Sequence, residues 1–309
     1  MKTSKKYGEL SCEELRHWIE GKKSFYLIDT LSGDHFRGRH LPGAKNACVF
    51  EISFIDQVKA ITAEKDSEIV LYGASKKSLD AVTAAEKLGQ EGFRHLNVLI
   101  GGIEAWHSLG LPLEGESIDA IPDPQKFLKL EDRSYLVDRD QSVIAWKGRN
   151  PSTTHFGNIR IASGKLSVKG GIITGIFDIV MDSITNTNLE GDELQPVLIA
   201  HLKSDDFFLT KLFPRARFEI TEALPTPEPY LSLPNYLING TLEIKGIKAN
   251  QQFTATLSKT PQQGLMAEAH FDIDRTRWGV IYGSTRFFEY LGMHLVFDLI
   301  TFEVRIVAN

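Results

Sequence analysis

The sequence predicts an α/β domain with a parallel sheet, followed by an antiparallel β-barrel or sandwich. Three observations support this fold class. Strand-like and helix-like segments alternate in the first third of the chain, and strands of period two dominate after it. A stretch rich in proline and glycine separates the two patterns. A length of 309 residues also agrees with two domains.

The first third alternates apolar runs with helical patterns. Residues 25–28 and 68–71 are short apolar runs of the strand type. Residues 79–88 carry apolar side chains at helical spacing, and the glycine pair that begins residues 101–106 opens another helix. Strands that alternate with helices in this way indicate a parallel sheet.

A linker is expected after the α/β pattern. Pro112, Gly115, Pro122 and Pro124 interrupt the sequence there, and proline and glycine are the strongest breakers of regular structure. The predicted divisions are residues 1–116 for the first domain, 117–132 for the linker and 133–309 for the second domain.

The second domain shows strands with one apolar and one polar face. Apolar and polar residues alternate, and residues 225–229 form the loop of a long hairpin, not a further boundary. Asp272 and Asp274 alternate outward beside Arg275 and Arg277, so surface ion pairs are expected. The alternating segments are residues 238–245, 253–258, 267–274 and 301–306.

Composition excludes several classes of protein. The chain is 42% hydrophobic and 24% charged, which is typical of a globular protein, and its net charge of −5 argues against nucleic-acid binding. No apolar run is long enough for a membrane helix, and no apolar leader follows Met1, so a cytoplasmic protein that is not an integral membrane protein is expected. Cys12 and Cys48 cannot form a disulfide framework, and the histidines lack metal-ligand spacing.

Several segments of the first domain match one family together. Asp29 ends a strand, residues 40–46 form a turn, and residues 101–112 form a closing helix and turn. Over residues 8–115 this pattern resembles the rhodanese (sulfurtransferase) family, whose nucleophilic cysteine directly follows the strand at residues 69–72. Gly73 stands at that position, and Leu31 replaces the arginine that usually follows the aspartate by two residues. The resemblance therefore implies a rhodanese fold that has lost its covalent chemistry.

The loop after the strand could still bind an anion or a partner. A loop of this type directs backbone N–H groups toward an anion at the start of a helix, and its serines and lysines add donors and charge. The alternative is a solvated connection with exposed lysines. Cys48 or Cys12 as an unconventional nucleophile is a further alternative, although neither has an evident base. The residues of the candidate loop are Gly73, Ala74, Ser75, Lys76, Lys77 and Ser78.

A second set of matching segments covers nearly all of the chain after the linker. The segments are residues 146–148, 155–159, 164–166, 175–184, 201–208, 213–218 and 240–246. In this order and spacing, residues 135–308 are similar to the YceI-like family of lipocalin-like proteins. The resemblance implies an eight-stranded antiparallel barrel whose apolar interior holds a long isoprenoid or a related fatty chain.

The candidate ligand-binding residues come from strands and from two expected helical segments. Phe207, Phe208 and Phe213 are expected in a short helix beside the barrel, and residues 286–295 are expected to form a helical lid. The alternative is that these side chains fill an ordinary core. The candidates are His155, Phe177, Ile179, Met181, Phe207, Phe208, Phe213, Phe271, Ile273, Trp278, Phe287, Tyr290 and Leu291.

The sequence hypothesis is binding, storage or transport of an apolar lipid, without an enzymatic reaction. The expected ligand is a polyisoprenoid, an isoprenoid quinone or a fatty chain, and no cofactor or metal is expected. The first domain would serve in docking a protein partner, in anion binding or in regulation. Two alternatives stay open: a sulfurtransferase relative with an unconventional thiol, and an interaction protein with a collapsed barrel. The oligomeric state is also open, with a dimer among the alternatives.

Overall fold

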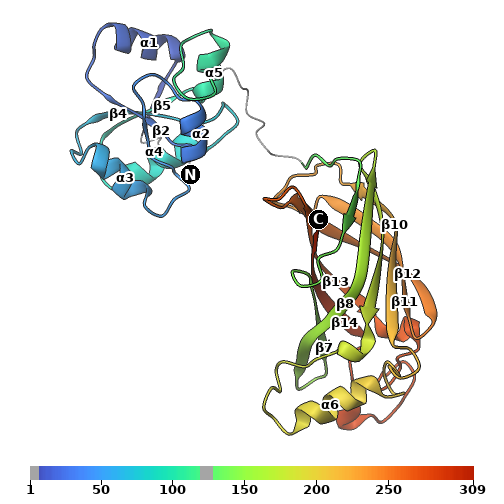
Figure 1. Cartoon of the computed structure of the whole chain (residues 1–309). Helices are drawn as coiled ribbons and strands as arrows, with labels where there is room; N and C mark the ends of the chain where they lie inside the picture. Colours follow the sequence, from blue (N-terminus) through green and yellow to red (C-terminus); the bar gives the residue numbers. More distant parts are fainter. Residues whose placement is uncertain (1–6, 119–127) are drawn as a thin grey trace. The chain divides into compact units, whose positions relative to one another are not determined.

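The computed structural model describes residues 7–118 and 128–309. The chain divides into two compact units, Met1–Pro122 and Asp123–Asn309, and each is described by itself (Figure 1). Of the predicted linker, residues 119–127 lie outside the described residues. Within the described ranges, every helix is too short or too polar to span a lipid bilayer.

The first unit is built on a five-stranded parallel sheet in the order β1-β5-β4-β2-β3. This confirms the predicted α/β fold class. The strands are β1 (Gly8–Leu10), β2 (Tyr26–Asp29), β3 (Lys45–Asn46), β4 (Glu68–Tyr72) and β5 (His95–Leu99). The helices are α1 (Cys12–Glu20), α2 (Gly33–Gly38), α3 (Phe54–Ile61), α4 (Asp80–Gln90) and α5 (Gly102–Ser108).

Helices cover both faces of this sheet, which explains why its strands are apolar without alternation. On β4, Ile69 and Leu71 join the core beneath α3 and α4. Val70 and Tyr72 point the other way, into a core shared with α1 and α5. The loop that follows β4 therefore starts from a strand that is fixed on both faces.

The second unit is a closed antiparallel barrel of eight strands, β7 to β14, in which β8 pairs with both β7 and β9 and β14 pairs with β7. The predicted barrel is confirmed. A short additional strand, β6, pairs with β8. The strands are β6 (Ser134–Leu136), β7 (Val143–Arg149), β8 (Thr154–Lys169), β9 (Ile172–Val180), β10 (Arg215–Pro225), β11 (Tyr236–Ile244), β12 (Ile247–Lys259), β13 (Leu265–Asp274) and β14 (Leu299–Ala308).

Helical elements gather at the end of the barrel opposite the C-terminus, where α6 is labelled in Figure 1. The chain leaves β9 and crosses this end before it returns in β10. A second excursion between β13 and β14 lies at the same end, because the rings of Tyr282 and His201 of α6 make an edge-to-face contact with centroids 4.7 Å apart. The elements are α6 (Leu194–Lys203) and the 3₁₀ turns η1 (Met181–Ser183), η2 (Arg275–Trp278) and η3 (Gly292–His294).

Two helix predictions for the second unit are wrong. Residues 205–213 form turns after α6, and residues 286–295 contain only the short turn η3. Tyr290 and Gly292 have φ of +55° and +54°, values that a right-handed helix cannot accommodate. The apolar residues at helical spacing in residues 287–294 therefore lie on a loop and not on one face of a helix.

The surface ion pairs predicted for residues 272–277 are also partly wrong. Asp274 does form an ion pair, but with Arg286 at 2.7 Å. Arg275 is 2% exposed and lies inside the end of the barrel. The strand ends at Asp274 and the chain continues into the turn η2, which carries the Arg275 side chain away from the surface aspartates.

Candidate functional site

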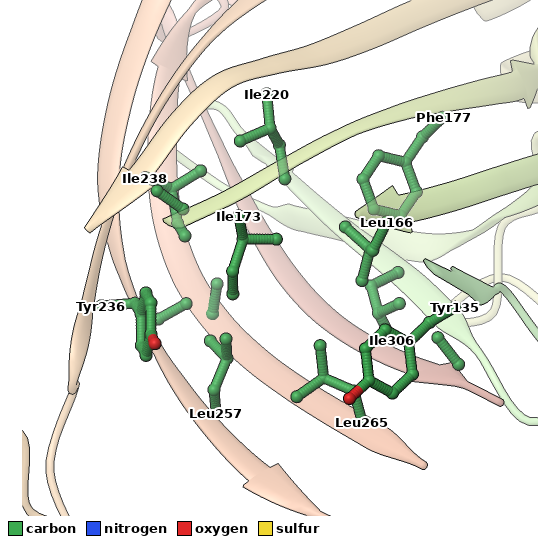
Figure 2. Packing of buried hydrophobic residues seen from close by; sticks show 14 of the residues in the cluster. Tyr135, Leu166, Ile173, Phe177, Ile220, Tyr236, Ile238, Leu257, Leu265 and Ile306 are labelled. Carbon is green, nitrogen blue, oxygen red and sulfur yellow. The ribbon is translucent and has the colours of Figure 1, made fainter. Parts of the chain in front are cut away.

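The interior of the barrel contains a cavity of about 380 Å³. Aliphatic and aromatic side chains from all eight barrel strands line it. Figure 2 shows one part of this lining, where Leu166, Phe177, Ile238 and Ile306 converge from different strands. A cavity of this size and composition is typical of a site for a small apolar molecule.

Four phenylalanines form a continuous aromatic wall on one side of the cavity. Phe253 and Phe271 stack with centroids 4.0 Å apart and an interplanar angle of 8°. Phe218 lies 5.7 Å from Phe253, and Phe302 lies 5.8 Å from Phe271. Gly240 makes room for this wall, because a Cβ there would lie 2.6 Å from the Phe218 ring.

Polar groups are concentrated at the end of the cavity near α6, which is the mouth. His201 Nε2 donates a hydrogen bond to the Asp206 carboxylate at 3.0 Å, and the Tyr282 hydroxyl lies 3.3 Å from Nδ1 of His294. The opposite end is closed by apolar residues such as Leu257 and Leu265. The polar lining residues at the mouth are Arg149, Asn150, His155, His201, Gln251, Arg275, Tyr282 and His294.

Arg275 holds the loop between β13 and β14 at the mouth. Its guanidinium donates hydrogen bonds to the carbonyls of Val280 at 2.6 Å, Val296 at 3.0 Å and Phe297 at 3.2 Å. Asp298 is 3.5 Å from the same group. Burial lowers the pKa of Arg275, while the carboxylates of Asp298 and Asp274 favour the charged form.

The structure places eight of the thirteen candidate residues on the cavity lining. Trp278 instead packs in the apolar cluster at the mouth and donates its indole N–H to the Leu242 carbonyl at 2.8 Å. Phe213, Phe287, Tyr290 and Leu291 are near the mouth but do not line the cavity. The eight are His155, Phe177, Ile179, Met181, Phe207, Phe208, Phe271 and Ile273.

Several residues that line the cavity are not among the candidates from the sequence, including three of the four phenylalanines of the aromatic wall. Phe218, Phe253 and Phe302 line the cavity, as do Ile144 and Trp146. The signal was present, because Phe253 and Phe302 lie on strands whose period-two alternation is clear in the sequence. Phe271 points into the barrel, and the same alternation applied to the neighbouring strands β12 and β14 identifies Phe253 and Phe302 as inward residues.

The second candidate site is the loop between β4 and α4. Gly73 directly follows β4, and its carbonyl accepts the N–H of Ile103 at 3.0 Å. The Ala74 carbonyl accepts the N–H of Glu104 at 3.1 Å. The first turn of α5 thus fixes the start of the loop, whereas Lys76 and Lys77 are exposed.

A carboxylate from the chain itself occupies the loop. Oδ2 of Asp80, the first residue of α4, accepts the N–H of Ala74 at 3.0 Å and the hydroxyl of Ser78 at 2.6 Å. Asp80 is buried. A Cβ at Gly73 would lie 2.7 Å from the same oxygen, so Asp80 fills the space that a side chain at position 73 would need.

Comparison with protein families agrees with both halves of this architecture. The YceI-like domain model matches residues 135–308, more than half of the chain. The chain belongs to the YceI-like family. The rhodanese-like domain model matches residues 11–109, so the first unit is a rhodanese-like domain. Among curated proteins, no match was found.

Solved structures resemble each unit separately. BcnA from Burkholderia cenocepacia is 17% identical with a TM-score of 0.45, and the match covers 56% of this chain and 99% of BcnA. A polyisoprenoid binding domain from Saccharophagus degradans is 11% identical with a TM-score of 0.40, over 57% of this chain and 97% of that domain. The rhodanese-like domain of Anabaena sp. Alr3790 is 24% identical with a TM-score of 0.33, over 40% and 92% of the two chains.

Asp29 is a buried carboxyl at the end of β2 in the rhodanese-like domain. Its Oδ1 accepts the Leu31 N–H at 2.8 Å. Burial raises the pKa of Asp29 to about 6, although the nearby Tyr72 hydroxyl, the Leu31 N–H and the charge of His40 favour ionisation. Leu31, two residues further along the chain, is itself buried in the core.

This pKa predicts that the rhodanese-like domain loses stability as the pH rises. The folded pKa of about 6 exceeds the ordinary value of 3.8, so the folded state binds more protons between these values. The contribution is complete below pH 3.8 and is lost as the pH rises through 6. As the pH rises from 4 to 8, we expect the free energy of unfolding of Asp29→Asn to increase by about 2–3 kcal/mol relative to that of the wild type. Urea unfolding followed by ¹⁹F-labelled Trp18 and Trp106 measures this, and parallel pH curves for the two proteins would contradict it.

The contact between Gly73 and Asp80 predicts a strong coupling between these positions. Gly73→Ala is expected to cost about 1–3 kcal/mol, because the added methyl group displaces a buried carboxylate. In the Asp80→Ala background the same change should cost much less. A double-mutant cycle on the full chain measures the coupling. Additive costs would show that Asp80 does not fill the space beside Gly73.

Both cysteines, Cys12 and Cys48, are buried. Burial and the charge of Glu13 raise the pKa of Cys12, which disfavours the nucleophilic thiolate. Cys48 follows β3, where its backbone N–H donates to the Gln57 side chain at 2.9 Å. The described ranges contain no group of histidine, cysteine and acidic side chains arranged to hold a metal ion.

Proposed function

We propose that the barrel binds, stores or transports a long apolar chain of the isoprenoid type, such as a polyisoprenoid or an isoprenoid quinone, or a fatty chain. The observation that carries this proposal is the polarity of the cavity. Its closed end is apolar, whereas imidazole, guanidinium and amide groups lie at the mouth. A chain with one polar end fits such a site when its head lies among His155, His201 and His294.

The energetics agree with an elongated apolar ligand. Burial of one methylene contributes about 0.8 kcal/mol, so one five-carbon unit contributes up to about 4 kcal/mol. Ordering of the flexible chain offsets part of this gain. Affinity therefore grows with the length of chain that the cavity admits, and the depth of the cavity selects the ligand.

The test is mass spectrometry of an organic extract from the purified, denatured full-length protein. We expect one apolar molecule per chain, of a defined mass. Protein that yields a clean extract should take up a chain from a mixture of isoprenoids, quinones and fatty acids. A clean extract both before and after this incubation would overturn the proposal and favour an interaction protein.

For the rhodanese-like domain we propose a role in docking, anion binding or regulation, without sulfur transfer. Gly73 follows β4 where the family resemblance places the nucleophile, and it has no side chain to carry sulfur. An anion in this loop would compete with the Asp80 carboxylate for the Ala74 N–H. Titration with thiosulfate or phosphate should therefore shift the amide signals of residues 73–78 more strongly in Asp80→Ala than in the wild type.

The enzymatic alternative has a direct assay. Transfer of sulfur from thiosulfate to cyanide should not exceed the uncatalysed rate in the wild type. The Cys48→Ser variant serves as the control, because Cys48 is the thiol that the alternative would use. Turnover in the wild type that disappears in Cys48→Ser would establish a sulfurtransferase with an unconventional nucleophile.

A further inference from the structure

The mouth of the barrel is bordered by apolar side chains that are exposed to solvent. On the loop between β13 and β14, Tyr290 is 99% exposed and Met293 is 88% exposed. Phe287 and Phe288 of the same loop are also exposed. We call these four residues, together with Leu194 and Val197 of α6, the mouth rim. Exposed apolar groups that gather at one place mark an interaction site more often than scattered ones do.

The apolar surface of the rim is continuous with that of the cavity. Met293 belongs to both, because it lines the cavity and is also exposed. On α6, Leu198 and Leu202 face the cavity, while Leu194 and Val197 extend the same apolar sector to the outside. An apolar chain could therefore pass from the rim into the cavity without leaving apolar surroundings.

The charges around the rim argue against an anionic partner. Residues 190–213 and 279–298, which carry the rim, contain seven carboxylates and three lysine or arginine residues, a net charge of −4 (3 − 7) without histidine. Of the cations, Lys203 is paired with Asp182 at 3.1 Å, and Arg286 is paired with Asp274 at 2.7 Å. Attraction to the rim must therefore come from its apolar and aromatic side chains.

We propose that the mouth rim docks on the surface of a neutral lipid bilayer, where the barrel loads or releases its chain. This inference rests on the proposed function, since a bilayer is the phase in which a long apolar chain resides. Tyr290 would enter the headgroup region, which favours amphipathic aromatic rings, and Met293 would enter the acyl boundary. The chain would then pass into the cavity without crossing water.

The experiment measures binding of the full-length protein to phosphatidylcholine vesicles by flotation. We expect binding that persists in 1 M salt, where charge interactions are screened within about 3 Å. The double variant Tyr290→Gln/Met293→Gln should bind about tenfold more weakly or worse, because it removes the two most exposed apolar groups of the rim. The matched control is Leu136→Gln/Val143→Gln, which removes two exposed apolar groups at the opposite end of the barrel.

Lipid content is measured in the same samples, which separates this inference from the proposed function. A wild type that retains a chain but does not float with neutral vesicles would overturn docking and leave the proposed function intact. Binding that requires anionic lipid and disappears in salt would also overturn it. Equal losses of vesicle binding in the rim and control variants would also overturn docking at the rim. If the rim variant instead dissociates a dimer, the rim is an interface between two copies.

Discussion

Replacing Ala267 with phenylalanine is expected to lower the amount of apolar chain that the barrel retains by at least about tenfold. Ala267 lies on β13 and lines the cavity, and its side chain is not fully buried, so a phenyl ring would project into free space. Displacing one five-carbon unit of a ligand removes up to about 4 kcal/mol of burial, and a tenfold loss needs only about 1.4 kcal/mol. For an isoprenoid-type ligand, a tenfold loss of bound chain therefore requires less than the burial energy of one displaced five-carbon unit.

The control for this variant is His270→Phe. His270 is on the same strand, but it is exposed on the outer face of the barrel. Both variants introduce the same side chain, and only Ala267→Phe shortens the cavity. Lipid is quantified per mole of folded protein, which removes any effect of a modest loss of stability. Equal lipid content in the two variants would show that the chain does not occupy this part of the barrel.

The strands of the barrel were predictable because a half-buried strand repeats every two residues. Phe177 and Ile179 on β9, and Phe271 and Ile273 on β13, were identified as inward residues from this alternation, and all four line the cavity. The parallel sheet was predictable for a different reason. Its central strands are covered on both faces and are therefore uniformly apolar.

The loops at the mouth were not predictable in the same way. Phe207 and Phe208 line the cavity, yet they lie in turns, where contacts depend on the path of the backbone and not on a period. Tyr290 stands at a helical spacing from Phe287, but its positive φ turns the chain. Local sequence shows that these residues are apolar, and only the fold shows which of them reach the cavity.

The occupied loop of the rhodanese-like domain illustrates the same limit. An acidic residue in the first turn of a helix is ordinary, because it interacts favourably with the helix dipole. Asp80 fits that description in the sequence. In the structure its carboxylate turns back to Ala74 and Ser78 and occupies the space beside Gly73. A pairwise contact of this kind appears only when the loop conformation is known.

Arg275→Ala is expected to destabilise the barrel by about 3–5 kcal/mol. The substitution leaves the carbonyls of Val280, Val296 and Phe297 without their donor and removes the partner of Asp298. A buried polar group without a partner costs about 1–3 kcal/mol, so loss of this cluster outweighs the desolvation of the guanidinium that the variant avoids. Arg275→Lys should recover only part of the loss, because an ammonium group cannot reproduce the planar fork.

Arg277 provides a matched control in the same 3₁₀ turn. Its guanidinium bonds the Asn250 carbonyl and the Gln251 side chain at the surface. Arg277→Ala should therefore cost less than about 1 kcal/mol. Urea unfolding of the full chain, followed by ¹⁹F-labelled Trp146 and Trp278, reports on the barrel alone. Similar losses for the two arginines would show that the carbonyls around Arg275 find other donors, and that the mouth loop is held by its apolar contacts.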